Sequence, residues 1–486
     1  MNFQLIDFLV LLTYLLGITF IGLFQKGKLD SYQNFFLANK ELPWQAIMLS
    51  IVATETSSLT FLSVPGMSYK NDFAFLQVAF GYILGRIFVA YLIFPLYATG
   101  KYSSIYEWVG ENFGISTQKS ISGVFLLSRV LADGVRLYVT SIPITFILQG
   151  YFPEYSYTTI NIFSLSLISA TTILYTVSGG FRAVVITDSL QFFIYIIGGC
   201  FTLFFLLSQL RNLGYTDFFI TGNFQKFKIF HGLEGSFLQS AYFFPTAIFG
   251  GMLLSIGSHG VDQMFAQRLL ACKNQKQGRY ALIGSGILVF FQFLLFLVIG
   301  VLLFYFYKDN SILPDKVFSK YMVENIPSPI LGLIVAAIFA SAMSTLSSSI
   351  NSLSLSVIVD WGEKLFASQN QLKNSKIISI FWGGVLFLSA LIPHFLSEKI
   401  LDSLLELGLK ITSFTLGPMI GIFLLGTFYS RGKISLQPKT LIKALFLGVL
   451  SVIAFSYFFQ PGFTLVIPLG ILIFYMYLLI FKISNL

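Results

Sequence analysis

Long apolar runs alternate with short polar segments along almost the whole chain. About 13 of these runs reach the roughly 20 residues that an α-helix needs to cross a bilayer. The predicted spans are residues 5–24, 43–68, 73–98, 119–149, 157–177, 183–208, 237–268, 279–305, 327–358, 374–396, 401–428, 440–458 and 463–482. This pattern predicts an all-α polytopic membrane protein in which residues 1–486 form a single transmembrane domain.

Composition agrees with this pattern and excludes a soluble globular protein. Of the 486 residues, 56% are hydrophobic and 10% are charged, and the mean hydropathy is +0.80. The first run has no basic segment before it, contains Asp7 and lacks a small-residue cleavage site. It is therefore predicted to be a retained helix rather than a signal peptide. Cys200 and Cys272 lie in different segments, which does not support a disulfide framework.

Positive charge is concentrated in the loops. The formal net charge is +9, and the basic residues lie mostly in short loops between apolar runs, which argues against a nucleic-acid partner. One set of alternate loops holds about 18 Lys and Arg residues and the other about 8. The positive-inside rule therefore predicts a plasma (inner) membrane protein with its N-terminus outside and its C-terminus in the cytoplasm.

Two predicted spans are interrupted near their middles by polar residues and glycine. The interruptions are residues 48–66, MLSIVATETSSLTFLSVPG, and residues 249–263, FGGMLLSIGSHGVDQ. Broken helices at corresponding positions of two halves are typical of an inverted-repeat transporter and mark its binding site. The alternative is that Gly and Ser only permit close helix packing, but packing does not account for Glu55 and Asp262.

The span at 327–358 is rich in hydroxyl groups although it lies within an apolar run. Its polar residues are Ser341, Ser344, Thr345, Ser347, Ser348 and Asn351, most of which share one helix face by their spacing. Together with carbonyls freed by the broken second span at Ala53 and Thr56, these oxygens suit a hard cation such as Na⁺. The alternative is that each hydroxyl binds a carbonyl of its own helix and only tightens packing.

A carboxylate is predicted inside the membrane at Asp188. The segment 175–193, YTVSGGFRAVVITDSLQFF, places it roughly a turn and a half into the helix that follows a tight turn at Gly179 and Gly180. A charged side chain at this depth is costly, so Asp188 is a candidate functional residue. A structural ion pair with Arg182 is the alternative.

Four segments are distinctive when they are taken together. They are GGFRAVVITDSLQ, VDQMFAQRLLACKN, the serine-rich run that ends in INSLSLSVIVD, and LGPMIGIFLLGTF. With this combination the chain resembles the sodium:solute symporter family, which includes sodium–sugar, sodium–proline and sodium–sialic acid transporters. The resemblance implies the LeuT-type fold, with two inverted five-helix repeats at 43–208 and 237–428, an extra helix at 5–24 and two further helices at 440–482.

The resemblance also implies sodium sites. The residues that correspond to the main site of the family are Ala53, Thr56, Ser341, Ser344 and Thr345. Some members have a second site, and its counterparts here are Asp188, Ser344, Ser347 and Ser348. One or two Na⁺ ions are therefore expected as coupling ions.

The substrate site that the resemblance implies lies at mid-membrane between the first, second, third, sixth and tenth core helices. Its candidate residues are Glu55, Ser57, Ser58, Thr60, Gln77, Arg129, Asp133, Arg136, Ser255, Ser258, His259 and Lys410. In sialic acid transporters an arginine of the third core helix binds the substrate carboxylate, and Arg129 and Arg136 are both candidates for that role. A network in which Arg129, Asp133 and Arg136 neutralise one another is the alternative.

These features predict sodium-coupled symport of a small polar organic solute, such as a sugar, sialic acid or another carboxylate, into the cell by alternating access. A proton-coupled or amino-acid transporter on the same fold is the alternative, with Asp188 or Glu55 as the proton carrier. An enzyme is not predicted, because the sequence has no HExxH, no GxSxG, no phosphate-binding Gly loop and no Cys/His metal cluster. The expected partners are the solute, sodium and the lipid bilayer, with no nucleic acid and no obligate protein partner.

Overall fold

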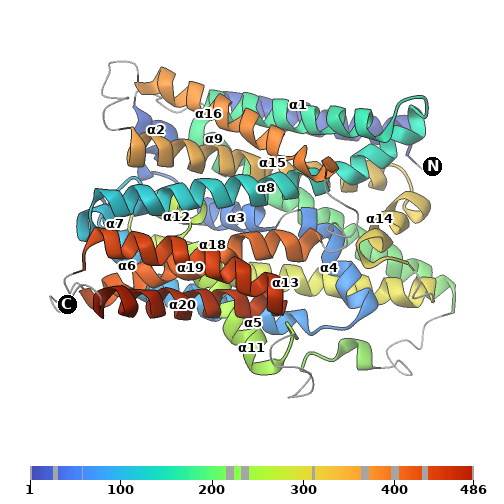
Figure 1. Cartoon of the computed structure of the whole chain (residues 1–486). Helices are drawn as coiled ribbons and strands as arrows, with labels where there is room; N and C mark the ends of the chain where they lie inside the picture. The colour runs from blue at the N-terminus through green and yellow to red at the C-terminus, as the bar shows by residue number, and fades with distance from the viewer. Residues whose placement is uncertain are drawn as a thin grey trace.

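The computed structural model describes residues 3–25, 31–56, 58–214, 224–230, 240–308, 312–362, 371–395, 404–429 and 436–483. These residues form a bundle of long helices, and the two chain ends lie at opposite ends of the bundle (Figure 1). In hydrocarbon a helix satisfies its backbone hydrogen bonds internally, which is why long apolar runs of this sequence fold in this way.

The long helices follow the predicted spans closely. They are α1 (Leu5–Phe24), α5 (Phe75–Phe88), α8 (Ile115–Tyr151), α9 (Tyr157–Asn212), α13 (Gln275–Tyr307), α15 (Ile330–Ser356), α16 (Gln371–Ser389), α18 (Leu404–Tyr429), α19 (Pro438–Phe459) and α20 (Phe463–Ile483). The shorter helices are α2 (Tyr32–Leu37), α3 (Trp44–Glu55), α4 (Ser58–Lys70), α6 (Phe94–Tyr97), α7 (Ile105–Phe113), α11 (Phe244–Ile256), α12 (Gln263–Leu270) and α14 (Pro314–Asn325). Three π-helical turns, η2 (Val89–Ile93), η5 (Gly257–Val261) and η6 (Val357–Trp361), continue α5, α11 and α15.

The number of membrane spans depends on how the broken helices are counted. In the described part of the chain, ten helices are long and apolar enough to cross a membrane, and the bent pair α3 and α4 makes eleven. α9 holds two of the predicted spans, because Gly180 (φ 63°, ψ −160°) divides it in a conformation that favours glycine. The segment from α11 to α12 is the remaining predicted span.

Both predicted interruptions are real breaks. α3 ends at Glu55, and the helix that follows is bent by 61° from it. α11 continues as η5, which ends at Val261. The backbone of the next residue, Asp262, is extended (φ −95°, ψ 125°) and breaks the helix. The Asp262 side chain then caps α12 by accepting a hydrogen bond from the Met264 amide at 2.9 Å. Such breaks free backbone groups that a transporter can offer to an ion or a solute.

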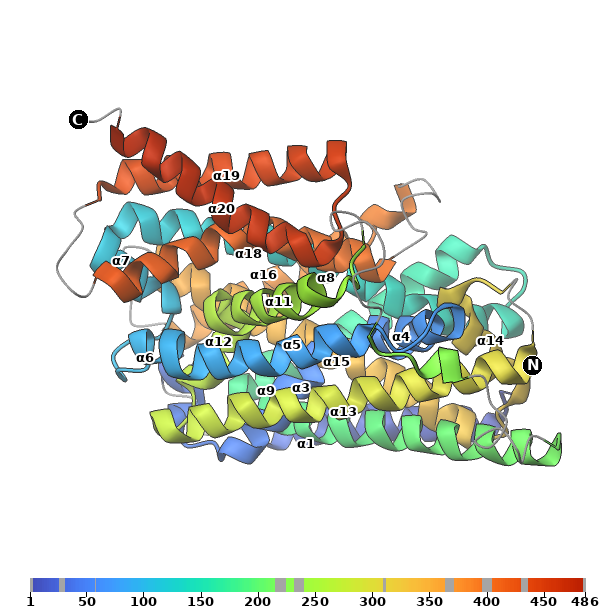
Figure 2. The same cartoon turned by 90° about the horizontal axis from the view of Figure 1, so that it is seen from below.

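Glycine allows two of the core helices to approach closely. Gly81 and Gly85 of α5 have the GxxxG spacing, and Figure 2 shows α5 lying alongside α11. A Cβ atom at Gly81 would lie less than 3.0 Å from the Ile248 carbonyl oxygen, and one at Gly85 less than 3.0 Å from the Met252 carbonyl oxygen. The α5–α11 contact therefore requires glycine at both positions.

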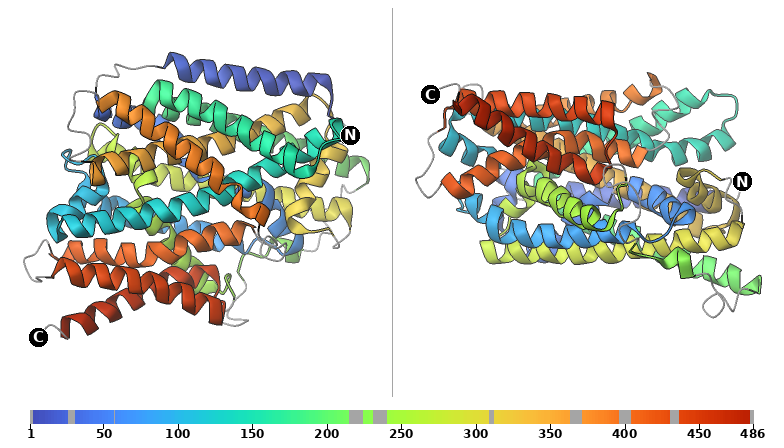
Figure 3. Two further views of the ribbon diagram at one scale, coloured as in Figure 1. Left: turned by 45° about the horizontal axis from the view of Figure 1, so that its top comes forward. Right: turned by 60° about the horizontal axis from the view of Figure 1, so that its bottom comes forward.

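The helices outside the predicted repeats lie at the edges of the bundle. α1 lies at one edge against α9 and α15, and α19 and α20 lie at the opposite edge against α18 (Figure 3). The broken helices α3–α4 and α11–α12 lie between these edges, with α11 in the foreground of Figure 2.

Candidate functional site

Ion pairs of four arginines with four carboxylates lie inside the described part of the bundle, and together we call them the polar core. They are Glu55–Arg86, Asp133–Arg136, Asp188–Arg268 and Asp262–Arg129. The most exposed of these side chains is that of Arg136, at 18%. Buried charges persist when they are paired and hydrogen-bonded, so these pairs account for carboxylates that helix packing alone leaves unexplained.

The hydroxyl-rich face of α15 lies against α3 at the point where α3 ends. Thr345 Oγ1 is 3.5 Å from the Thr54 carbonyl oxygen, and Ser344 Oγ is 3.4 Å from Thr54 Oγ1. One narrow cavity is lined by Ala53 and Thr56 from α3 and its end, and by Ser341 and Ser344 from α15. The residues predicted for the main sodium site are therefore brought together.

Several of these hydroxyls also bind carbonyls of their own helix, as the packing alternative predicts. Thr345 donates to the Ser341 carbonyl at 3.1 Å, and Ser347 and Ser348 donate to the Ser344 carbonyl at 3.0 and 2.6 Å. A hydroxyl that donates one hydrogen bond retains its oxygen lone pairs. Such bonds therefore fix the oxygen in place and leave it able to bind a cation.

Asp188 is fully buried, and its two oxygens have different surroundings. Oδ2 accepts hydrogen bonds from Arg268 Nη2 at 2.9 Å and from Ser50 Oγ at 2.5 Å. Oδ1 has no hydrogen-bond partner within the described part of the chain. The alternative pairing with Arg182 is wrong, because Arg182 is exposed and Arg268 holds the carboxylate.

Arg268 lies among the residues predicted for the second sodium site, where the sequence pattern gave no sign of it. Its Nη2 group donates to Thr54 Oγ1 at 2.6 Å and to Ser348 Oγ. Thr54 Oγ1 is also 3.0 Å from Ser348 Oγ. The guanidinium group therefore joins α12 to α3, α9 and α15, and it binds Asp188 through Oδ2 and not through Oδ1.

The charged residues of α8 form the Arg–Asp–Arg network that the sequence gave as the alternative to substrate binding. Arg129 pairs with Asp262 and lies 3.5 Å from Asp133, whereas Arg136 pairs with Asp133 at 3.0 Å. Arg136 and Asp133 also line a small cavity, which we call the Arg136 cavity, together with Ser341 and Thr345 of α15. Arg136 is thus the arginine that shares a cavity with residues predicted to bind sodium.

The remaining substrate candidates that the structure describes do not line the Arg136 cavity. Glu55 binds Arg86 and has His259 Nε2 at 3.6 Å, while Ser258 Oγ is 2.8 Å from His259 Nδ1. Ser255 donates to the Tyr82 carbonyl at 3.0 Å, and Gln77 donates to the Tyr242 carbonyl at 3.3 Å. Thr60 is buried on α4, and Lys410 is half-buried on α18. Ser57 and the side chain of Ser58 lie outside the described residues.

Contacts around α7 close one end of the bundle. Asp360, in η6, accepts hydrogen bonds from Ser104 Oγ at 3.2 Å and from Gln118 Nε2 at 2.9 Å. The Ile105 amide donates to Gln263 Oε1 at 2.9 Å. The start of α7 therefore ties α12 to α15 and α8 at the end where the C-terminus lies (Figure 1).

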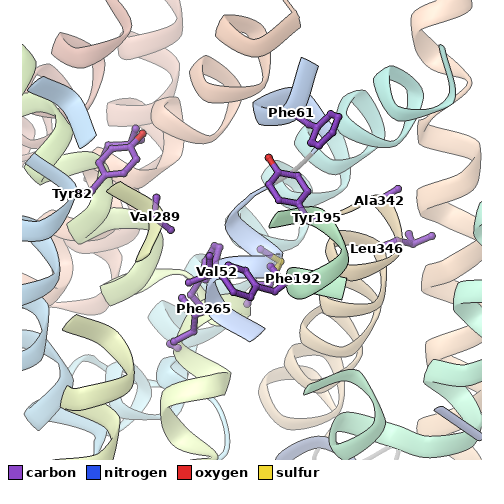
Figure 4. Close-up of a cluster of buried hydrophobic side chains, with 14 of the residues drawn as sticks. Val52, Phe61, Tyr82, Phe192, Tyr195, Phe265, Val289, Ala342 and Leu346 are labelled. Atoms are coloured by element: carbon purple, nitrogen blue, oxygen red, sulfur yellow. The ribbon is translucent and has the colours of Figure 1, made fainter. Parts of the chain in front are cut away.

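The cavity beside the residues predicted for the main sodium site is also lined by residues that were not among the sequence candidates. They are Gln191 and Tyr195 of α9 and Gln292 of α13, which line it together with residues of α3 and α15. Figure 4 shows the Tyr195 ring beside Phe61, and their ring centroids are 5.0 Å apart. The spacing held a signal, because Gln191 follows Asp188 by three residues and so lies on a neighbouring part of the same helix face.

A helical bundle with two matching breaks around a buried polar core defines an α-helical secondary transporter. The model for the sodium:solute symporter family matches residues 35–435. The chain belongs to the sodium:solute symporter family. It is a sodium-coupled symporter of a small solute, with sodium as the coupling ion, and it is not an enzyme.

Similar proteins agree with this assignment. The sodium/sialic acid symporter SiaT of Proteus mirabilis is 27% identical over 442 residues, which cover 89% of this chain and 86% of the relative. The sodium/sialic acid symporter NanT of Aliivibrio fischeri is 27% identical over 446 residues, covering 89% and 85%. The human sodium/iodide cotransporter is 25% identical over 458 residues, covering 87% and 66%.

Solved structures confirm the predicted fold class. The substrate-bound outward-open state of a Na⁺-coupled sialic acid symporter has a TM-score of 0.82 and 24% identity, and the match covers 98% of this chain and 97% of that one. The nucleobase-cation-symport-1 family transporter Mhp1, in a closed conformation, has a TM-score of 0.60 and 12% identity, with 94% and 95% covered. The all-helical LeuT-type fold is therefore confirmed.

Proposed function

We propose that the chain takes up a small solute that carries a carboxylate, and that Arg136 binds this group. The observation that carries the proposal is the Arg136 cavity, where the arginine, Ser341 and Thr345 line one space. A guanidinium group offers two parallel donors to a carboxylate. Support for the substrate class comes from SiaT and NanT, which are sodium/sialic acid symporters.

Arg136 suits this role better than Arg129. Arg129 is 3% exposed and lies between two carboxylates, those of Asp262 and Asp133. Arg136 forms its ion pair with Asp133, and part of its side chain faces the cavity. A solute carboxylate at Arg136 would approach the sodium ligands on α15, so each ligand would raise the affinity for the other.

The main sodium site is proposed at Ala53, Thr56, Ser341, Ser344 and Thr345. A second sodium ion would bind Asp188 Oδ1 with the hydroxyls of Ser344, Ser347 and Ser348, while Arg268 remains on Oδ2. The hydroxyls that are fixed by their own helix and the carboxylate oxygen without a partner among the described residues support this assignment.

The topology is proposed from the same features. The repeats would be residues 43–208 and 237–428, with 5–24 before them and 440–482 after them, and the matched breaks at Thr56 and Asp262 support these bounds. The N-terminus would be outside and the C-terminus in the cytoplasm, which the Lys and Arg bias of the loops supports. Opening toward the cytoplasm would then have to break the contacts of Asp360 and Gln263 at α7.

Uptake into proteoliposomes tests the proposal. N-acetylneuraminic acid, its methyl ester, glucose and alanine are compared at fixed pH, with an inward gradient of sodium or of choline. The free acid should accumulate in sodium and not in choline, and the ester, which has lost the carboxylate charge, should compete poorly. Equal uptake of the acid in both salts would refute coupling, and preference for glucose or for the ester would refute carboxylate recognition.

A further inference from the structure

The cavity beside the proposed main sodium site is lined by three buried polar side chains from α9 and α13. Gln191, Tyr195 and Gln292 are 1%, 3% and 2% exposed. They share this cavity with Ala53, Thr56, Ser341 and Ser344, which are four of the five residues proposed to bind sodium. We call this space the Gln191 cavity.

Each of the three side chains presents a polar atom that lacks a partner among the described residues. Gln191 Nε2 donates to Tyr14 Oη at 3.3 Å, which leaves Gln191 Oε1 without a hydrogen bond to any described residue. Tyr195 Oη and Gln292 Nε2 make no hydrogen bond of good geometry to a described residue, although the two side chains are neighbours. Buried polar atoms are almost always satisfied, and a ligand in this cavity would satisfy atoms that the described residues leave open.

The chemistry of these atoms favours a cation. Two of them, the Gln191 amide oxygen and the Tyr195 phenol oxygen, are neutral oxygen donors, which Na⁺ accepts as other hard cations do. Gln292 plays a different part, because its Oε1 accepts a hydrogen bond from Thr56 Oγ1 at 2.9 Å. It therefore positions the end of α3, where a sodium-binding carbonyl is proposed.

The position of Tyr195 is fixed by its neighbours. Its ring packs edge-on against Phe61 of α4 and against Phe296 of α13, and the ring centroids are 5.0 and 5.3 Å from its own. Figure 4 shows Tyr195 between Phe61 and Phe192. Gln191 lies one helical turn before it on the same face of α9. Both side chains therefore line the cavity from neighbouring turns of α9.

We propose that Gln191 and Tyr195 are further ligands of the main sodium site and bind the ion from the side of α9. This inference rests on the proposed sodium site. It gives the shell two side-chain oxygens from α9, the helix that also carries Asp188, and it links sodium binding at the main site directly to α9 as well as to α3 and α15.

The test uses Gln191→Met and Tyr195→Phe, which remove an oxygen and keep most of the side-chain volume. Gln209→Met and Tyr321→Phe are matched controls, because this pair has the same residue types and a hydrogen bond of 2.7 Å outside the cavity. The melting temperature of each purified full-length protein is measured while sodium replaces potassium at constant ionic strength, and no solute is needed.

The half-saturating sodium concentration should rise about tenfold in Gln191→Met and in Tyr195→Phe, while the melting temperature in potassium stays at the wild-type value. The controls should keep wild-type sodium titrations. A sodium titration within about twofold of wild type in both cavity variants overturns the inference, as does a loss of stability that is equal in sodium and potassium. A wild-type protein without any sodium-dependent shift overturns the proposed sodium site and this inference with it.

Discussion

Ser344→Ala is the substitution that should damage sodium coupling most directly. Ser344 is fully buried, its Oγ lies 3.4 Å from Thr54 Oγ1, and the residue lines the Gln191 cavity. It is also the one residue assigned to both proposed sodium sites. Removing its hydroxyl takes an oxygen from the ion and leaves the helix backbone intact, since alanine is the strongest helix former.

The magnitude follows from the strength of the interaction between the hydroxyl oxygen and the ion. A hydrogen bond or dipole interaction with a charged group contributes roughly 1.5–3 kcal/mol. At about 1.4 kcal/mol per factor of ten, the half-saturating sodium concentration should rise about 10- to 100-fold. If both ions use this hydroxyl, the Hill coefficient for sodium should change as well.

The matched control is Ser354→Ala on the same helix. Ser354 is fully buried and donates to the Ile350 carbonyl at 2.6 Å, and neither cavity includes it. Ser349 would be a poor control, because its hydroxyl binds the Asp133 carboxylate of the polar core. Sodium-dependent uptake is measured in proteoliposomes at saturating solute, with choline replacing sodium. Equal effects of Ser344→Ala and Ser354→Ala would refute the assignment of Ser344 to sodium.

Three further predictions concern the solute, the polar core and helix packing. Arg136→Gln should raise the half-saturating concentration of a carboxylate solute about 10- to 100-fold, and an unchanged value in an uptake assay would contradict the role of Arg136. Asp188→Asn leaves the Arg268 charge buried without its partner and should lower the free energy of unfolding by about 3–5 kcal/mol. The double variant Asp188→Leu with Arg268→Met should recover much of this lost stability. Denaturation in potassium measures both. Gly85→Ala should lower the free energy of unfolding by about 1–3 kcal/mol through overpacking. Gly384→Ala is the control and should not lower it, because nothing lies within 4 Å of its added Cβ. Equal melting temperatures for the two variants would show that the α5–α11 contact can relax.

The sequence was sufficient to predict the spans and both breaks. Hydropathy reports depth in the membrane, and a polar interruption such as that around Asp262 is visible within a short window of residues. The sodium ligands proposed on α15 could also be named in advance, because helical spacing places them on one face and the family motifs match.

The partners in the polar core were not predictable from local patterns. Arg268 reaches Asp188 across 80 residues of sequence, and Asp262 reaches Arg129 across 133. Hydropathy does not specify how each helix is rotated about its axis, so it cannot tell which buried charges meet. For the same reason Arg182, which is near Asp188 in sequence, was a reasonable but wrong alternative, and the wall that carries Tyr195 was missed.

The balance of charge in the polar core also determines how the membrane potential acts on transport. Its four arginines offset its four carboxylates, so the empty core carries no formal net charge. One Na⁺ with a monovalent anionic solute would leave the loaded core neutral too, whereas a second Na⁺ would give it one positive charge, worth about 2.3 kcal/mol per 100 mV. Electrical current during uptake of an anionic solute would therefore count the sodium ions: one ion should carry no current, and two should carry one charge per solute molecule.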